Sequence, residues 1–233
     1  MKQDSIVRIL LVEDDLEICE ILQFYLLTNT DYELTIVHSA EQALPLARKR
    51  AYQLILLDIM LPGMDGIQFC EELRKTSFCP IIFISCLSDD KTIIRALNMG
   101  GDDYLTKPFE AAVLHAKIEA NLRRGRPEAE APPTITNGEL ALIPSRQKVS
   151  KNGEDLVLSP TEYAILAYLM RNPGKIISFD ALYKAIWQRS SFGDFRALFV
   201  HITHLRQKVE DDPAKPLYIR THMRSGYIFG IEE

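Results

Sequence analysis

Four nearly continuous apolar runs in the first half of the chain end at polar residues. The runs cover residues 6–12, 54–57, 81–84 and 104–106, and the polar residues that follow are Glu13, Asp14, Asp58, Ser85 and Lys107. Runs of this kind are typical of parallel strands that are covered on both faces. The carboxyl ends of such strands meet at one edge of a sheet, so we expect three carboxylates, a hydroxyl and an ammonium group to share a pocket there.

Segments with helical periodicity alternate with these runs. They cover residues 16–27, 41–49, 67–75, 91–99 and 111–124, and a further short strand is expected at 34–37. Five strand and helix pairs predict an α/β fold, in which a five-stranded parallel, doubly wound sheet lies between layers of helices.

The composition is typical of a soluble globular protein. Hydrophobic residues make up 47% and charged residues 25% of the chain, and no apolar stretch approaches the roughly 20 residues that cross a bilayer. The first residues lead directly into a strand rather than into a signal-peptide core, so we expect a cytoplasmic protein with no membrane partner. The four cysteines form no Cys-x-x-Cys pair and lie in apolar surroundings, which favours reduced, buried thiols.

A segment with three prolines divides the chain. Residues 125–133 contain few side chains able to fill a core, so we expect an exposed linker between a domain at 1–124 and a second domain at 134–233. The first domain has 13 basic and 19 acidic side chains, a charge of −6; the linker has −1; the second domain has 13 and 11, a charge of +2. An acidic half and a mildly basic half indicate different partners.

The second domain is expected to be α+β. Short strands are predicted at 139–143, 148–151 and 156–158, followed by a C-terminal hairpin with strands at 218–221 and 227–229. The dipeptide Asn152-Gly153 is a strong signal for a two-residue hairpin turn.

Three helices complete this domain. Ser159, Pro160 and Glu162 predict a capping box at the start of a helix that ends at 172–174. Another short helix is expected after Ser178, and a longer helix at 195–210 has an apolar stripe at 4, 3, 4 spacing.

The polar residues at the strand ends suggest phosphoryl chemistry. Three carboxylates in one crevice repel one another and need a compensating cation, and Mg²⁺ prefers carboxylate, carbonyl and water oxygens while bridging to phosphate. Asp58 is then the natural nucleophile, because a carboxylate can accept a phosphoryl group as an acyl phosphate. Lys107 would add positive charge, and Ser85 would donate a hydrogen bond to a phosphoryl oxygen. Each residue alone is more often a surface charge or a helix cap, but their convergence favours a site.

Four motifs in the first half resemble the receiver domain of two-component response regulators. They are Leu10-Leu-Val-Glu-Asp-Asp15, Leu56-Leu-Asp-Ile-Met-Leu-Pro-Gly-Met-Asp-Gly66, Ile81-Ile-Phe-Ile-Ser85 and Gly101-Asp-Asp-Tyr-Leu-Thr-Lys-Pro-Phe109. The second half, through residues 158–163, 200–206 and 218–227, resembles the winged-helix effector domain of the OmpR/PhoB-type subfamily. The resemblance implies a flavodoxin-like receiver that a linker joins to a winged helix-turn-helix domain.

The resemblance also implies a metal-binding role for the acidic residues. Asp58 would be the phospho-acceptor. Glu13 and Asp14 would be the acid pair for Mg²⁺, and Asp58 itself and the carbonyl group of Met60 would be further ligands.

Three other receiver residues would act on the phosphoryl group. Lys107 and Ser85 would contact it, and Tyr104 would be the aromatic residue whose rotation reports phosphorylation. Cys86 stands where the family has a small residue, commonly alanine, so its bulk is expected to hinder phosphoryl access.

The fourth and fifth helices of the receiver depart from the family pattern. Ile93 and Val113 stand where the family has ion-pairing residues, and Asn98 replaces a glutamate. Asp103 and Lys117 remain compatible with one inter-subunit ion pair. We therefore expect a homodimer across this surface, with an apolar contact from Ile93 and Val113.

The helix at 195–210 is expected to enter the major groove of double-stranded DNA. The face opposite its apolar stripe consists of Arg196, Val200, Thr203 and Gln207. Further expected DNA-binding residues are His201, His204, Arg206 and Lys208 beside that face and Arg224 at the hairpin tip. Phe199 appears where an aspartate is common in the family. His201 and His204 do not predict a zinc site, because no cysteine or carboxylate lies near them in the sequence.

Together these features predict a phosphorylation-controlled transcription regulator rather than an independent enzyme. A sensor histidine kinase would phosphorylate Asp58, and the protein would bind promoter DNA as a homodimer, with RNA polymerase as a further candidate partner. Two alternatives remain open. Cys86 and the altered helices suggest a phosphorylation-independent DNA-binding regulator, and an Mg²⁺-dependent aspartyl-phosphate phosphatase would share the site, although Met60 stands where such phosphatases have a second acid.

Overall fold

The computed structural model describes residues 6–28, 32–124, 133–188, 191, 193–223 and 225–230, and the chain forms two compact units at 1–122 and 123–233. Within the described residues, no helix combines the length and the apolar character that crossing a membrane requires. The expected linker falls almost entirely on residues 125–132, which lie outside the described part of the chain.

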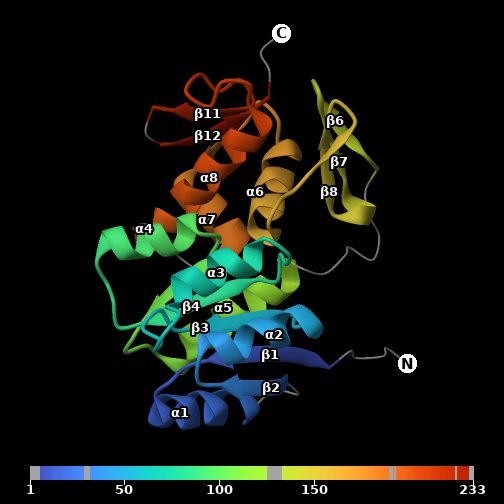
Figure 1. Ribbon diagram of the computed structural model, residues 1–233. Coiled ribbons are helices and arrows are strands. Elements are labelled where there is room, and N and C mark those ends of the chain that lie inside the picture. The colour runs from blue at the N-terminus through green and yellow to red at the C-terminus, as the bar shows by residue number, and fades with distance from the viewer. Residues whose placement is uncertain are drawn as a thin grey trace. The chain divides into compact units, whose positions relative to one another are not determined.

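The first unit is a five-stranded parallel sheet flanked by helices (Figure 1). Its strands pair in the order β2-β1-β3-β4-β5 and are β1 (Val7–Val12), β2 (Tyr32–Val37), β3 (Leu54–Leu57), β4 (Ile81–Ser85) and β5 (Asp103–Thr106). Its helices are α1 (Leu16–Leu27), α2 (Ala40–Lys49), α3 (Gly66–Arg74), α4 (Asp90–Asn98) and α5 (Ala111–Arg124). The predicted α/β fold is confirmed. Only β2 begins more than one residue from its expected position.

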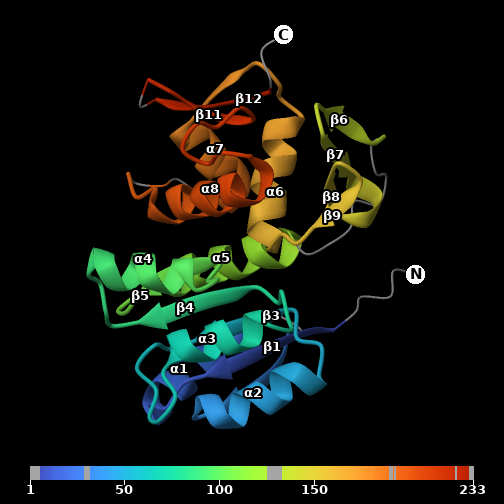
Figure 2. The ribbon, with the colours of Figure 1, turned by 45° about the horizontal axis from the view of Figure 1, so that its top comes forward.

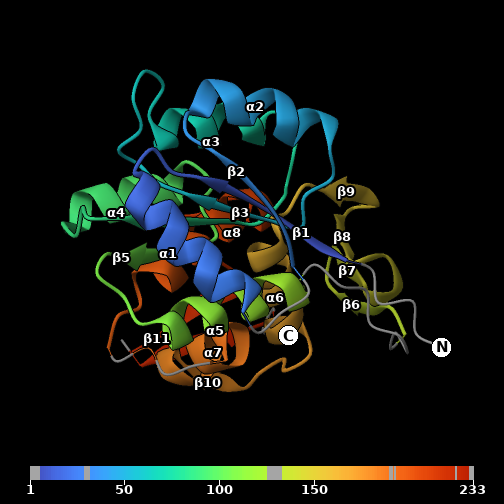
Figure 3. The same ribbon diagram turned by 90° about the horizontal axis from the view of Figure 1, so that it is seen from below.

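Helices α1 and α5 cover one face of this sheet, and α2 and α3 lie on the other side (Figure 3). Alternate strand residues such as Ile9 and Leu56 form one buried cluster with Leu22 of α1 and Ile118 of α5. Burying an aliphatic side chain of this size contributes roughly 1.5–3 kcal/mol. The near-continuous apolar character of the strands is explained by burial on both faces, since all four residues of β3 are buried.

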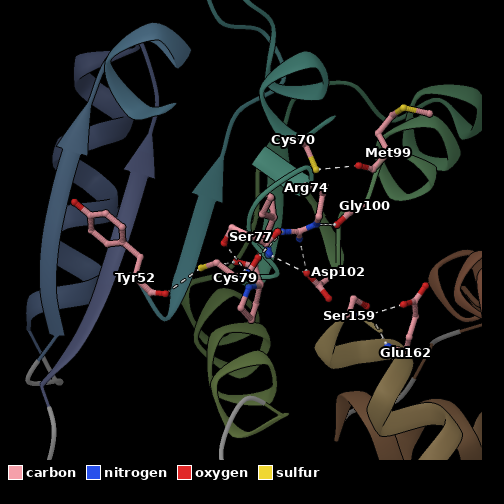
Figure 4. A network of polar contacts seen from close by, with 12 residues as sticks. Tyr52, Cys70, Arg74, Ser77, Cys79, Met99, Gly100, Asp102, Ser159 and Glu162 are labelled. Atoms are coloured by element: carbon pink, nitrogen blue, oxygen red, sulfur yellow. Dashed lines mark hydrogen bonds and ion pairs between the residues drawn. The ribbon is translucent and has the colours of Figure 1, made fainter. Parts of the chain in front are cut away.

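Arg74 of α3 holds the segments that enter β4 and β5 (Figure 4). Its guanidinium donates to the Asp102 carboxylate at 3.0 Å and to three carbonyl groups, those of Ser77 at 3.2 Å, Cys79 at 2.7 Å and Gly100 at 2.9 Å. Asp102 also accepts the N–H of Ile81, the first residue of β4, at 3.0 Å. This ion pair therefore fixes where two strands begin, and the opposite ends of those strands reach the candidate site.

The described residues of the second unit form two antiparallel sheets and three α-helices (Figure 2). The first sheet pairs in chain order and consists of β6 (Ile135–Asn137), β7 (Leu140–Ile143), β8 (Lys148–Lys151) and β9 (Glu154–Leu156). The second sheet has the order β10-β12-β11 and consists of β10 (Ile176–Ser178), β11 (Ile219–His222) and β12 (Gly226–Phe229). The helices are α6 (Pro160–Met170), α7 (Phe179–Trp187) and α8 (Arg196–Val209), and a short 3₁₀ turn covers Pro144–Arg146.

Of two local structures predicted for this unit, the structure confirms one and contradicts the other. The capping box at Ser159 and Glu162 is confirmed, because each side chain accepts the other residue's backbone N–H. The strand expected at 156–158 was wrong, because the two-residue turn at Asn152-Gly153 pairs β9 with β8 from Glu154 onward.

Candidate functional site

Backbone hydrogen bonds bring the ends of the receiver strands to one edge of the sheet. The N–H of Asp58 donates to the carbonyl of Val12, and the N–H of Lys107 donates to the carbonyl of Ser85, both at 2.9 Å. Gly66 makes the turn after β3 compact, because a Cβ atom there would lie 2.0 Å from the carbonyl oxygen of Asp58. The expected convergence of strand-end residues is therefore present.

Lys107 links the two buried carboxylates of this edge. Its Nζ lies 2.6 Å from Oε2 of Glu13 and 2.6 Å from Oδ2 of Asp58, and both acids are almost fully buried. Burial raises the pKa of Glu13 to about 7, and the charge of Asp58 acts in the same direction. Burial alone would lower the pKa of Lys107, but its hydrogen bonds to Asp58 and Glu13 outweigh that effect, so its pKa is raised.

The acidic residues are placed as a metal site requires. Carboxylate oxygens of Glu13, Asp14 and Asp58 all lie within 4.8 Å of one another. Asp15 takes a different role, since its side chain accepts two N–H groups as the N-cap of α1. The N–H of Met60 donates to Oδ1 of Asp58 at 3.0 Å. Three carboxylates beside one ammonium group leave an excess of negative charge, which fits a hard divalent cation with oxygen ligands.

Ser85 and Tyr104 stand beside this cluster on β4 and β5. The Ser85 hydroxyl is fully buried and has no hydrogen-bond partner among the described residues. Tyr104 is also buried, and its hydroxyl donates to the carbonyl of Leu87 at 2.6 Å. Cys86, the next residue after Ser85, is exposed, so the expectation of a buried thiol was wrong at this position. The loop after β4 is thus tied to β5 through the tyrosine.

The residues of the expected dimer surface are mostly buried within this chain, and their contact with a second subunit stays a prediction. Ile93, Asp103 and Lys117 are each at most 3% exposed, and Val113 packs against the hydrophobic core. Ile93 belongs to the buried stripe of α4, and Lys117 forms a buried ion pair with Asp103 of the same chain. These side chains are therefore not free for a second subunit in this structure.

The outer face of α8 also differs from the prediction. Val200 and His201 are 7% and 3% exposed, so their expected position on the outer face is corrected: both side chains are buried in this structure. The buried stripe is wider than the periodicity suggested, because Ala197 is buried as well. The exposed residues are instead Phe199, Thr203 and Gln207, one turn apart, with the partly exposed Arg196 at the start of the helix. The expected contact at Arg224 falls outside the described residues.

Several polar residues of α8 are used within the second unit. Arg206 donates to the carbonyl of Ile219 at 2.7 and 2.9 Å and to the hydroxyl of Thr221 at 2.9 Å, which fastens α8 to the C-terminal hairpin. Lys208 donates to Glu162 of α6 at 2.6 Å, and His204 lies 3.8 Å from the same carboxylate. Burial lowers the pKa of His204. Sequence periodicity could not reveal these roles because the partners lie on other elements.

Comparison with known proteins agrees with this geometry. Residues 9–119 match the family model of the response regulator receiver domain, and residues 153–229 match that of the transcriptional regulatory protein C-terminal domain. The transcriptional regulatory protein AfsQ1 of Streptomyces coelicolor is 40% identical over 94% of this chain and 96% of its own length. YrkP of Bacillus subtilis, an uncharacterized transcriptional regulatory protein, is 38% identical over 96% and 98%.

Similar solved structures point to the same family of proteins. DrrB, an OmpR/PhoB homolog from Thermotoga maritima, is 28% identical with a TM-score of 0.52, and a RitR mutant is 26% identical with a TM-score of 0.75. Each comparison covers 97% of this chain and 100% of the other. The chain therefore belongs to the OmpR/PhoB-type response regulators, phosphorylation-controlled transcription regulators that combine a receiver domain with a winged-helix DNA-binding domain.

Proposed function

We propose that Asp58 accepts a phosphoryl group from a sensor histidine kinase and that this modification controls DNA binding through α8. The observation that carries the proposal is the position of Lys107, whose ammonium group lies 2.6 Å from both Asp58 and Glu13. A carboxylate held against a lysine at the end of a parallel strand can take up a phosphoryl group whose charge the lysine offsets.

In the proposed transfer, an Asp58 carboxylate oxygen attacks phosphorus. The new P–O bond forms as the P–N bond of the phosphohistidine breaks, and the imidazole leaves with the electron pair of that bond. Glu13, Asp14, Asp58 and the carbonyl of Met60 would hold Mg²⁺, which when bound supplies positive charge to the phosphoryl oxygens. Lys107 then donates a hydrogen bond to the phosphoryl group in place of its bond to Asp58.

The buried Ser85 hydroxyl is the proposed sensor of the phosphoryl group. It has no hydrogen-bond partner among the residues that the structure describes, so a phosphoryl oxygen on Asp58 would give it one. Movement of Ser85 would shift the loop that follows β4. The carbonyl of Leu87 in that loop accepts a hydrogen bond from the Tyr104 hydroxyl, so the shift would reach Tyr104. Tyr104 is therefore proposed to report phosphorylation to the rest of the receiver.

The DNA-reading residues are proposed to be Arg196, Phe199, Thr203 and Gln207. A glutamine amide can pair with adenine, and a phenylalanine ring or a threonine methyl can contact the methyl group of thymine. In the free protein Arg196 is paired with Asp194 at 2.8 Å. A DNA phosphate that binds Arg196 would therefore replace the Asp194 carboxylate as its partner. This set favours sites rich in A·T pairs.

We further propose a receiver at residues 1–124, a linker at 125–133 and a DNA-binding domain at 134–233. The protein would act in the cytoplasm as a homodimer on promoter DNA, with RNA polymerase as a partner. Since three residues of the expected dimer surface are buried, dimerisation across it would require Ile93, Asp103 and Lys117 to become exposed.

The test is phosphorylation by a small phosphodonor with Mg²⁺, followed by intact-mass measurement. The wild-type chain should gain one phosphoryl group, Asp58→Asn should gain none, and the control Asp15→Asn should behave as wild type because asparagine also caps helices. A wild-type chain that stays unmodified would leave the phosphorylation-independent regulator as the better reading.

The phosphatase alternative is weaker on chemical grounds. Such an enzyme needs a second acid two residues after the nucleophile, and that position is Met60, which is 56% exposed. Turnover of small phosphate esters by the wild-type chain would reverse this judgement.

A further inference from the structure

Two histidines of α8 meet a carboxylate of α6 inside the second unit. Ligand atoms of Glu162, His201 and His204 all lie within 4.8 Å of one another. Glu162 and His201 are each 3% exposed, and the His204 side chain is 20% exposed. Helices α6 and α8 are in contact, and they lie next to each other in both Figure 1 and Figure 2. The carboxylate that is missing near the histidines in the sequence is therefore supplied by another helix.

The carboxylate of Glu162 is held in a fixed orientation. Its Oε2 accepts the N–H of Ser159 at 2.7 Å and the ammonium group of Lys208 at 2.6 Å. Its Oε1 lies 3.8 Å from Nδ1 of His204. One oxygen therefore maintains the helix cap while the other approaches the imidazole of His204.

We propose that Glu162, His201 and His204 form a binding site for a divalent cation of the zinc class. Two imidazoles and one carboxylate are a recognised ligand set for Zn²⁺, with a fourth position left for water. Imidazole also favours zinc, cobalt and nickel over Mg²⁺, which prefers oxygen. The acidic pocket of the receiver and this site therefore select different ions.

Lys208 is the local competitor for Glu162. Its ammonium group neutralises the carboxylate in the metal-free protein, but its side chain is 35% exposed and can turn into solvent when a cation binds. A bound ion would then connect α6 directly to the helix proposed to read DNA. Because the ion binds the folded state, it should raise the melting temperature of the protein.

Trp187 provides a local readout. It is the single tryptophan of the chain, it is buried, and its ring centroid lies 6.2 Å from that of His201. Co²⁺ is the probe, because it takes the same ligands as Zn²⁺ and, with its unfilled d shell, quenches a nearby indole. The full-length protein is freed of metal, saturated with Mg²⁺ and titrated with CoCl₂ while tryptophan emission is followed.

The wild-type chain should lose Trp187 emission with one equivalent of Co²⁺, and Zn²⁺ should displace the ion and restore the signal. Replacing His204 by Gln should weaken binding at least about tenfold, since even outer-shell changes weaken metal sites by 10- to 100-fold. Glu162→Gln, which can keep the helix cap, should do the same, and His222→Gln on the hairpin should bind as wild type. Asp58→Asn should also bind as wild type, so the result is separate from the receiver chemistry.

Two results would overturn the proposal. One is a wild-type chain whose Trp187 emission does not respond to Co²⁺. The other is equal affinity in the wild type and in folded His204→Gln, with folding checked by circular dichroism; if that variant does not fold, the same comparison with Glu162→Gln decides.

Discussion

Nζ of Lys107 lies 2.6 Å from Oδ2 of Asp58, so the group that would stabilise a phosphoryl modification already contacts the residue that would carry it. The same ammonium group also holds Glu13, and the lysine side chain is only 7% exposed. The free pocket is therefore a buried charge cluster in which Lys107 is the one cation found among the described residues. Removing Lys107, Asp58 or Glu13 should therefore change the charge balance of this cluster.

Lys107→Met should destabilise the receiver in the absence of divalent ions. Two buried carboxylates would lose their counter-charge, and breaking a buried ion pair in this way costs roughly 3–5 kcal/mol. Urea unfolding at pH 8 with and without Mg²⁺ measures the effect, and Mg²⁺ should restore part of the loss. The control Lys91→Met removes an exposed charge from α4 and should change little. A Lys107→Met protein as stable as wild type without Mg²⁺ would show that the cluster does not need its lysine.

Arg74→Met should lower the free energy of unfolding by roughly 3–5 kcal/mol, because it leaves the fully buried Asp102 carboxylate without its ion-pair partner. Lys75→Met, at the C-cap of the same helix, is the matched control, since Lys75 pairs with Glu72 in solvent. Thermal and urea unfolding compare the two. If the two variants lose the same stability, the Arg74 ion pair is not a main support of β4 and β5.

Cys86 should react with iodoacetamide long before the other thiols at pH 8. Cys86 is exposed, whereas burial raises the pKa of Cys70 and of Cys79 to about 12. A thiol with that pKa has a thiolate fraction of only about 10⁻⁴ at pH 8, and the thiolate is the reactive form. Peptide mass mapping identifies the labelled site. Label on Cys86 should also slow phosphorylation of the neighbouring pocket, and Cys86→Ala should be insensitive to the reagent; equal rates before and after labelling would contradict the steric argument.

Phe199→Asp should weaken DNA binding and change its sequence preference. Phe199 is 42% exposed, and its ring packs edge-on against Phe179 at 5.2 Å, which holds it on the outer face of α8. Loss of the contact should remove discrimination of the order of one mismatched base pair, about 1–3 kcal/mol, at the position that Phe199 reads. Selection of bound sequences from a random pool, for wild type and variant, measures the change. An unchanged preference would remove Phe199 from the reading face.

Most of the receiver fold was predictable from local sequence signals. The strand ends at Asp58 and Lys107 were predicted because burial on both faces makes the runs apolar. The face of α8 was less predictable. The 4, 3, 4 period finds the centre of the buried stripe, but it does not show that Val200 and His201 are buried as well.

Contacts between distant elements could not be read from one sequence. Strands β6 and β10 are short, and their partners β7 and β12 decide that they are strands at all. Glu162 approaches His204 only because α6 packs against α8. Arg206 was expected to contact DNA, yet its guanidinium donates a hydrogen bond to the carbonyl of Ile219 in β11.

The most direct test of the account measures how phosphorylation changes DNA affinity. Wild-type protein and Asp58→Asn are treated with phosphodonor and Mg²⁺, and the dissociation constant for a selected DNA site is measured before and after treatment at one salt concentration. Coupling between two sites is typically 1–3 kcal/mol, so the wild type should bind roughly 5- to 150-fold more tightly after treatment, and Asp58→Asn should not change. Equal affinity before and after modification of the wild type, or the same gain in Asp58→Asn, would contradict control through Asp58.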